Sequence, residues 1–339
     1  QAGPCPRAEF LVGSLSPRQS SSRPIRSFIG RSNPDSCGGP SRFMANSALA
    51  RMQRAALAIT ASASLGTHSR SNSSTCADKH PGFSVITWNV LARPYTKYNA
   101  KFHMAGSGVE TLDQTKARYS MASKELLKRS SDLVYLQECE AGFFNASEKL
   151  LNEYFLFRCA DGHKPGTAVL VKKTGNVVAS SDKPICVGGS DATGGPSKVA
   201  TIVPVKVGLR DIMAISAHFT WDGASEQRQH HLDLIFKEVQ GGLPVVLGGD
   251  FNSEPGLSLQ AMESSSLLRD LHRVSKSRGA VTGLSSDFKE QVCIDHVYAA
   301  RELWVRTATT LGSPSSPWKN KDVVAASDHV PVMVELYMD

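Results

Sequence analysis

The chain contains short apolar segments that each end abruptly in a polar or ionisable residue. The clearest spans residues 243–247, carries the β-branched valines typical of a buried strand, and is stopped by two glycines. Asp250 and Asn252 follow, two residues apart. If the extended backbone continues, alternation places both side chains on one face and turns Phe251 towards the core. This pattern predicts a site that orients water or a phosphate oxygen, although for this segment alone a simple polar turn is the alternative.

Five other apolar segments carry polar residues in the same way: Asn89, Glu138, His218, Asp295 and the pair Asp328-His329. Polar groups at the ends of buried strands cost free energy unless they meet and satisfy one another. Because the strand ends of an α/β sheet converge on one edge, where ligand sites form, we expect these side chains to share a cleft. Taken singly, each has a plainer alternative, such as a loop-capping asparagine or a hydrogen-bonded structural histidine.

Hydrophobic periodicity predicts strands that alternate with helices and also follow one another directly. Strands are expected over residues 84–90, 132–138, 154–158, 167–172, 199–207, 212–217, 243–247, 292–298 and 332–337, and helices over 111–129, 146–151, 226–240 and 258–268. This order favours a mixed-sheet α/β sandwich over a purely parallel sheet. We expect His230 and His231 on a helix exterior and His296 in a structural role.

Residues 1–80 differ in composition from the rest of the chain. They hold ten of the 38 Lys and Arg residues but three of the 31 Asp and Glu residues, which leaves 28 of each sign and no net charge in residues 81–339. Rich in Ser, Arg, Ala, Gly and Pro, this segment cannot bury enough apolar surface to fold alone. It is typical of an organellar transit peptide, with a basic amphipathic helix expected over 44–59 and Met44 as a possible start. A mitochondrial or plastid location is therefore expected, with a disordered tail on a cytoplasmic protein as the alternative.

Seven cysteines, an odd number that includes no Cys-x-x-Cys pair, argue against a disulfide framework and a zinc site. They favour a reducing compartment. No apolar run of 18 residues, the length needed to span a bilayer, occurs in the sequence.

The residue types at the strand ends indicate hard-cation chemistry. Glu138, Asn89 and one of the aspartates, Asp328 in our assignment, offer oxygen ligands suited to Mg²⁺ or Mn²⁺. His329, if paired with Asp295, would be held in one tautomer or protonated and could donate to a phosphate oxygen. The combination predicts metal-assisted hydrolysis of a phosphate ester or diester.

The order of these motifs resembles the endonuclease/exonuclease/phosphatase superfamily over nearly all of residues 83–339. The matching segments are Trp88-Asn89, Leu136-Gln137-Glu138, Gly166-Thr167-Ala168, Ala217-His218, Gly249 to Pro255, Ile294 to Val297 and Ser327-Asp328-His329. The resemblance implies an α/β fold of two mixed β-sheets packed as a sandwich flanked by helices, four layers in all. Residues 81–339 would form this catalytic domain, with the metal site at one end of the sandwich.

The resemblance also implies a role for each motif residue. Glu138 would be the main Mg²⁺ ligand, and Asn89 would support both the metal and the phosphate. Asp250 and Asn252 would position the attacking water. His218 would bind the phosphate together with Asn252, and Asp295 would pair with His329.

Within the superfamily the chain is most similar to the deadenylase, nocturnin, angel and 2′-phosphodiesterase branch, with one departure: His296 stands where that branch usually has tyrosine. We expect a monomeric phosphodiester hydrolase acting on single-stranded RNA or short oligonucleotides as a 3′ exonuclease. The bases would stack on Tyr95, Tyr98, His103 and Trp318, or these side chains would pack in the core. The alternatives are a phosphatase on a nucleotide, a dinucleotide cofactor or a phospholipid headgroup, and a catalytically silent binding module.

Overall fold

The computed structural model describes residues 82–98, 110–160, 164–188, 200–220, 225–239, 241–254, 257–265, 267–275, 281–284, 291–311 and 326–338. The expected leader and amphipathic helix lie outside these residues, as do His103, Trp318 and the side chain of Tyr98. Within the described ranges, no helix combines the length and apolar character that a membrane crossing requires.

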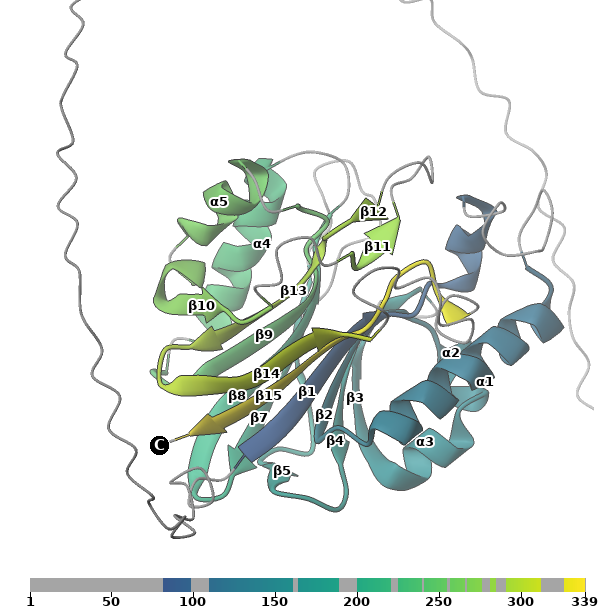
Figure 1. The fold of residues 1–339 in the computed structure, drawn as a ribbon, viewed down its shortest axis with the longest axis horizontal. Helices are drawn as coiled ribbons and strands as arrows, with labels where there is room; N and C mark the ends of the chain where they lie inside the picture. Colours follow the sequence, from purple (N-terminus) through teal and green to yellow (C-terminus); the bar gives the residue numbers. More distant parts are fainter. Residues whose placement is uncertain are drawn as a thin grey trace, which may run out of the picture. The chain divides into compact units, whose positions relative to one another are not determined.

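Two mixed β-sheets form the centre of the fold (Figure 1). The first has the order β14 (Leu303–Thr310), β15 (Val332–Met338), β1 (Gly82–Asn89), β2 (Leu133–Cys139), β4 (Gly166–Lys172) and β3 (Tyr154–Cys159). The second has the order β10 (Leu271–Arg273), β13 (Asp295–Ala300), β9 (Val245–Asp250), β8 (Arg210–His218), β7 (Ala200–Val207) and β5 (Val177–Ala179), with β6 (Ile185–Val187) also paired to β7. A small hairpin of β11 (Gly283–Leu284) and β12 (Gln291–Val292) completes the strands.

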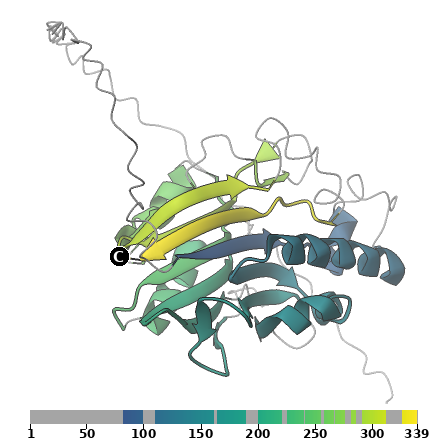
Figure 2. The same cartoon turned by 60° about the horizontal axis from the view of Figure 1, so that its bottom comes forward.

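One parallel pair lies within each sheet, and both pairs carry site residues at their ends. β1 runs parallel to β2, and β8 runs parallel to β9, while the other pairings are antiparallel. β15, near the end of the chain, lies directly beside β1 at the start of the domain (Figure 2). The expected two-sheet mixed sandwich is therefore confirmed.

Helices cover the outer face of each sheet and complete four layers (Figure 1). The first sheet is covered by α1 (Leu112–Arg129), α2 (Ala141–Asn145) and α3 (Glu148–Glu153), and the second by α4 (Ser225–Glu238) and α5 (Leu257–Glu263). Two 3₁₀ turns, η2 (Arg93–Tyr98) and η3 (Leu268–Asp270), lie in the connections. A capping box between Thr111 and Gln114 begins α1, and Ser130 ends it in the left-handed conformation.

Polar side chains connect the two sheets through an otherwise apolar interior. The Tyr135 hydroxyl donates to the Val246 carbonyl at 3.2 Å, and Gln137 Nε2 donates to Ser216 Oγ at 3.0 Å. A third bond runs from Thr201 Oγ1 to the Thr167 carbonyl at 2.9 Å. Because a buried polar atom without a partner is costly, these bonds favour a single placement of one sheet on the other. That placement fixes how far apart the site-carrying strand ends lie.

The predicted elements differ from the observed ones at their ends, and the short strands β5, β6, β10, β11 and β12 were not predicted as separate strands. The helix expected over 258–268 is shorter and separates into α5 and η3, and the helix expected over 146–151 begins later and is preceded by α2. Strand β14 was not predicted because it is an edge strand with mostly polar, exposed residues and an exposed Trp304. Its position depends on pairing with β15, which no local pattern reveals.

The cysteine prediction needs correction. Cys159 on β3 and Cys186 on β6 form a disulfide that joins the two sheets, whereas Cys139 and Cys293 are free thiols. These partners are 27 residues apart and meet only because β6 pairs with β7 of the second sheet. The sequence offered no spacing from which this pairing could be deduced.

We expect Gly249→Ala to destabilise the domain. A Cβ at Gly249 would lie 1.8 Å from the Ala217 carbonyl oxygen on β8, so the parallel β8–β9 pair would have to separate. Overpacking of this kind costs about 2 kcal/mol or more in unfolding free energy, measurable by chemical denaturation. Gly241→Ala is the matched control, since nothing lies within 4 Å of its added Cβ; equal stability of both variants would contradict the packing.

Reduction of the Cys159–Cys186 bond should lower the thermal stability of the folded domain. The bond closes a loop of 27 residues, and the loss of that constraint on the unfolded chain costs about 3 kcal/mol. Melting with and without dithiothreitol measures the effect. The double variant Cys159→Ala/Cys186→Ala should melt, with and without dithiothreitol, at the melting temperature of the reduced wild type. If dithiothreitol does not change the melting temperature of the wild type, the two thiols do not pair in solution.

Candidate active site

The polar strand ends meet at one edge of the sandwich, as the sequence predicts. Asn89 and Glu138 come from the parallel pair β1–β2 of the first sheet, and His218 and Asp250 end the parallel pair β8–β9 of the second. Asp295 begins β13, which runs antiparallel to β9 and pairs directly with Asp250. Asp328 and His329 precede β15, which runs antiparallel to β1. The sheet directions therefore bring all six segments to one place.

Asn89 links two carboxylates from different sheets. Its Nδ2 donates to Glu138 Oε1 at 2.9 Å and to Asp250 Oδ2 at 3.0 Å. His218 Nε2 lies near the same two oxygens, 3.8 Å from Glu138 Oε1 and 3.4 Å from Asp250 Oδ2. Glu138, His218 and Asp250 thus have ligand atoms within 4.8 Å of one another.

Asp250 also belongs to a second group, with Asp295 and His329. His329 Nδ1 donates to Asp295 Oδ2 at 2.9 Å, and its Nε2 lies 3.8 Å from Asp250 Oδ2. Burial opposes a charge on His329, but the Asp295 carboxylate and its hydrogen bond raise the histidine pKa well above 6.5. Burial raises the pKa of Asp295 to about 6. Because the imidazole lies so close, the proton shared by the two groups resides on His329 and the Asp295 carboxylate is ionised. The expected Asp295–His329 pairing is present.

Asp250 is ionised although it is buried. Burial alone would raise its pKa, but the hydrogen bond from His218, the nearby His329 and the Asn89 amide together hold the pKa well below its usual range. An ionised, buried carboxylate with fixed donors on both oxygens can hold a cation or orient a water.

The backbone at the site adopts rare conformations. Three of the four non-glycine residues with positive φ among the described residues are site residues or their neighbours: Leu91, Glu138 and Asn252, at 52°, 57° and 47°. Glu138 lies at the irregularity between β2 and β4, where the ladder skips from Leu136 to Cys139. The left-handed conformation aims the Glu138 carboxylate at Asn89, while Ala92 N–H donates to its other oxygen at 3.0 Å. Such strain persists only where surrounding contacts impose it.

Asn252 corrects one detail of the sequence analysis. The extended backbone does not continue past Asp250, because Asn252 is left-handed and its N–H donates to Asp250 Oδ1 at 2.8 Å. Its side-chain Nδ2 donates to the Phe219 carbonyl at 2.8 Å and joins the segments that follow β8 and β9. Phe251 is buried as expected, against Phe219 and Tyr298.

The predicted metal ligands do not all come together as expected. Asp250 lies beside Glu138, and Asp328 belongs to neither group of clustered ligand atoms among the described residues. Burial raises the pKa of Asp328. Asn89 presents its N–H to the carboxylates, and its Oδ1 accepts from Leu91 N–H at 3.0 Å. Metal ligation by Asn89 and Asp328 stays a prediction.

The donor set fits a hard divalent cation. Glu138 and Asp250 offer two carboxylates from opposite sheets, and Asp295 and Asp328 add buried acids nearby. Asp295 Oδ1 has no hydrogen-bond partner within the described part of the chain. This concentration of buried negative charge requires neutralisation, and oxygen ligands are those that Mg²⁺ and Mn²⁺ prefer. Glu138 and Asp250 would hold the ion, with His218 beside them.

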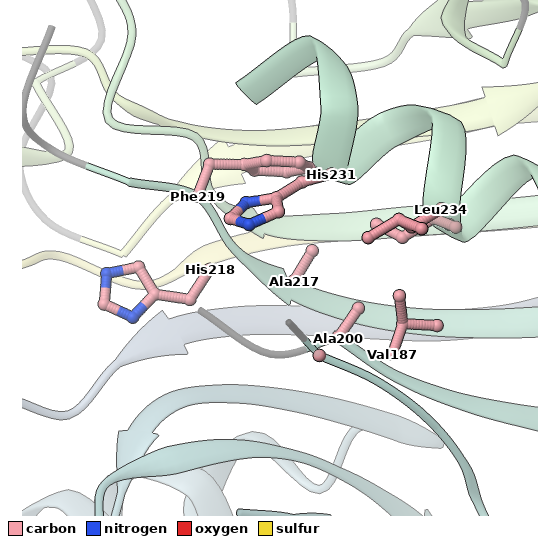
Figure 3. A pocket seen from close by; sticks show the side chains of 9 residues that line it. Val187, Ala200, Ala217, His218, Phe219, His231 and Leu234 are labelled. Carbon is pink, nitrogen blue, oxygen red and sulfur yellow. The ribbon is translucent and has the colours of Figure 1, made fainter. Parts of the chain in front are cut away.

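A pocket lies behind His218, between α4 and β8 (Figure 3). Ala217 and Phe219 face this pocket with His231 and Leu234, whereas the His218 ring points away from them (Figure 3). Strand alternation explains the difference, since neighbouring residues face opposite sides of a sheet. His231 is half-buried here, in contrast to the expected solvated exterior, while His230 is exposed as expected.

Two residues within the quoted motifs have contacts that sequence analysis did not assign. Ser327 Oγ donates to the Asn89 carbonyl at 2.6 Å and accepts from His329 N–H at 3.1 Å. Trp88 Nε1 donates to the His329 carbonyl at 2.9 Å. Both bonds join β1 to the segment before β15. Because Trp88 precedes Asn89 and Ser327 precedes Asp328, the sequence could have marked both as residues near the site. Their hydrogen-bond partners could not be predicted, because these lie far away in the chain.

Comparison with known proteins identifies the family. The family model described as Endonuclease/Exonuclease/phosphatase family matches residues 86–329. The chain belongs to this family. The match supports hydrolysis of phosphoric esters by this chain, while no curated protein matches it by sequence.

Several solved structures share the fold. ANGEL2, a 2′,3′-cyclic phosphatase, in complex with adenosine-2′,3′-vanadate, has 16% sequence identity and a TM-score of 0.60, and the match covers 77% of this chain and 96% of that one. The human nocturnin catalytic domain with bound sulfate has 20% identity and a TM-score of 0.56, with the same coverages. A family protein from Bacteroides thetaiotaomicron has 17% identity, a TM-score of 0.57, and coverages of 76% and 98%. At these identities the likeness shows the fold.

His296 has the structural role that was expected. It is fully buried, and its Nε2 lies 2.8 Å from the Ser253 carbonyl, which anchors the turn after Asp250. Burial lowers the His296 pKa to about 4, although the contact with Ser253 opposes this shift. Between pH 6.5 and 4 the unfolded state therefore binds a proton that the folded state does not bind.

We expect His296 to make the domain less stable as the pH falls from 6.5 to 4. The shift to about 4 corresponds to about 3 kcal/mol, present in full above pH 6.5 and lost as the unfolded histidine becomes protonated. His296→Gln can keep a donor to the Ser253 carbonyl and cannot titrate. Between pH 6.5 and 4 its unfolding free energy should therefore fall by about 3 kcal/mol less than that of the wild type. Urea denaturation across this range measures both. Exposed His230→Gln is the control and should follow the wild type; parallel curves for all three proteins would contradict the assignment.

Proposed function

We propose that this chain is a Mg²⁺-dependent phosphodiester hydrolase acting on single-stranded RNA or short oligonucleotides. The observation that carries the proposal is the meeting of Glu138 and Asp250, from different sheets, on a single Asn89 amide with His218 beside both. A buried carboxylate, Asp250, and a partly buried one, Glu138, with a histidine and an amide match the needs of metal-assisted attack on phosphorus. Mn²⁺ has the same ligand preference.

Asp250 is the residue proposed to activate water. Its Oδ2 accepts from Asn89, and its Oδ1 accepts from the Asn252 backbone N–H, so the carboxylate cannot rotate. Ionised and fixed, it would orient the attacking water by accepting a hydrogen bond from it. Asn252, anchored to the Phe219 carbonyl, is proposed to position the substrate phosphate and this water.

The two histidines are proposed to stabilise the phosphoryl group. His218 and the protonated His329 present Nε2 to the cluster from different sheets, 3.4 Å and 3.8 Å from Asp250 Oδ2. Asp295 keeps His329 oriented and protonated, so the imidazolium can donate to a non-bridging phosphate oxygen. A bound divalent cation supplies further neutralisation of the charge that develops on phosphorus.

A second candidate is a phosphatase that acts on a nucleotide or on a nucleotide-like end group. ANGEL2, whose structure shares this fold, is described as a 2′,3′-cyclic phosphatase, and its structure holds adenosine-2′,3′-vanadate. The same cluster could serve either substrate, because the chemistry at phosphorus is shared. A dinucleotide cofactor or a phospholipid headgroup would be a further substrate for such a phosphatase. The complete set of charged groups argues against a catalytically silent binding module. Of the side chains expected to stack on bases, Tyr95 lies half-buried in η2.

The organellar address proposed for residues 1–80 and the monomeric state rest on the sequence alone. Import of a fusion carrying residues 1–80 into isolated mitochondria or plastids tests the first. Light scattering of the purified protein tests the second.

A substrate panel tests the proposed function. Poly(A), 2′,5′-linked oligoadenylate, a 2′,3′-cyclic nucleotide and a nucleotide 2′-phosphate are assayed with Mg²⁺ and with chelator. Processive shortening of poly(A) that requires Mg²⁺ supports the nuclease, and turnover of the small nucleotides alone supports the phosphatase. If no phosphate ester is hydrolysed, the proposed function is wrong.

Glu138→Gln should lower kcat by about 10³-fold, equivalent to about 4 kcal/mol of transition-state stabilisation. The glutamine keeps the shape and the hydrogen-bond acceptor for Asn89 but removes the charge that would hold the cation. Steady-state kinetics on the best panel substrate measures the loss. Glu302→Gln, at an exposed turn between β13 and β14, is the matched control; near-wild-type turnover of Glu138→Gln would remove Glu138 from the mechanism.

A further inference from the structure

Two buried arginines lie on the helices outside the two sheets. Arg118 is on α1, which covers the first sheet, and Arg228 is on α4, which covers the second. Their exposed fractions are 2% and 4%. Because burying a guanidinium costs free energy that an apolar residue of similar size would not cost, the bonds these two make need an explanation.

Arg118 holds two segments of the first sheet. One nitrogen, Nη1, donates to the carbonyl of Val90 at 2.8 Å and to the carbonyl of Ala326 at 3.2 Å. Val90 follows Asn89, and Ala326 lies two residues before Asp328. The other donors of Arg118 bind Glu110, a buried carboxylate that neutralises the charge.

Arg228 does the same for the second sheet. Its Nη1 donates to the carbonyl of Thr220 at 3.1 Å and to the carbonyl of Asn252 at 3.3 Å. Thr220 lies two residues after His218, and Asn252 lies two residues after Asp250. Each arginine thus joins, through one nitrogen, the backbones of two segments that carry site residues.

We propose that Arg118 and Arg228 are positioning residues, each of which fixes the spacing between two active-site segments from behind its sheet. The proposal rests on the proposed function. The guanidinium group is planar and rigid, so two carbonyls that accept from its Nη1 are held at one separation. No strand pairing does this for the segments concerned, since all four carbonyls lie beyond the strand ends.

The two arginines have different consequences because they hold different ends of the site. Arg118 supports Asn89, which bonds the proposed metal ligand Glu138, and the segment that carries Asp328. Arg228 supports Asn252 and the segment after His218, which are proposed to act on the water and phosphate. Arg118 should therefore affect the metal requirement, and Arg228 should affect the chemical step.

The test uses the full chain with Arg118→Met/Glu110→Gln, Arg118→Lys, Arg228→Met and Arg228→Lys. The double variant removes the guanidinium without leaving Glu110 charged and buried, so that the fold is retained. Thermal unfolding shows that each variant is folded at the assay temperature. Lys116→Met on α1 and Lys237→Met on α4, both exposed, are matched controls and should behave as the wild type.

We expect kcat to fall by about 100-fold in both methionine variants, with KM within about twofold of the wild type, because displacement of positioned groups slows chemistry more than binding. The Mg²⁺ concentration for half-maximal activity should rise about tenfold in Arg118→Met/Glu110→Gln, because Asn89 bonds both proposed cation ligands. It should rise by about twofold or less in Arg228→Met, because Asn252 bonds only Asp250 of the two. Lysine cannot bind both carbonyls with the same geometry and should not restore kcat. Wild-type kcat in a folded methionine variant, full rescue by lysine, or equal Mg²⁺ dependence of the two variants would overturn the proposal.

Hydrogen exchange without metal or substrate gives a readout that does not depend on activity. Amides of residues 90–92 and 329–330 should exchange faster only in the Arg118 variants, and those of residues 219–220 and 252–253 only in the Arg228 variants. Uniformly faster exchange would assign a general stabilising role and overturn the proposal. If the wild type hydrolyses no phosphate ester, the proposed function fails, while the exchange pattern still decides whether each arginine holds its two segments.

Discussion

The site depends on one shared hydrogen-bond donor. Asn89 Nδ2, from the first sheet, bonds Glu138 on its own sheet and Asp250 on the other. Without that amide, two carboxylates of like charge would face each other across the edge of the sandwich and share only the more distant His218. The strained backbone at Glu138 and Asn252, the buried His329–Asp295 pair and the low pKa of Asp250 all belong to the geometry that this contact completes.

The rest of the fold fixes the distance across which Asn89 reaches. Inter-sheet bonds from Tyr135 and Gln137, and the close approach of β8 to β9 at Gly249, set the separation of the strand ends. Ser327 and Trp88 then attach the segment before β15 to β1. The active-site residues lie at strand ends or in the segments next to them, and each is bonded to an element with a defined position, which holds catalytic groups precisely enough for phosphoryl chemistry.

Most of the long strands, and the meeting of their polar ends at one edge, could be predicted from local patterns. Residues 245–250 and 133–139 are apolar runs whose burial leaves no other place for Asp250 and Glu138 than a shared polar edge. The prediction failed where long-range pairing decides the outcome. Strand β14 pairs with β15, Cys186 meets Cys159 through β6, and His231 lines a pocket formed with β8. In each case the partner is remote in the chain, so neither composition nor periodicity carries the information.

The sequence by itself determined which residues end buried strands, their order along the chain, and so the family to which the chain belongs. Hydrophobic burial acts locally on a strand, and its pattern is written in neighbouring residues. Only the tertiary structure decided that Asp250 and Glu138 share the Asn89 amide, and that Asn252 turns away from the extended path to bond Phe219. These contacts depend on ångström-scale distances between segments, which sheet packing and side-chain bonds set together.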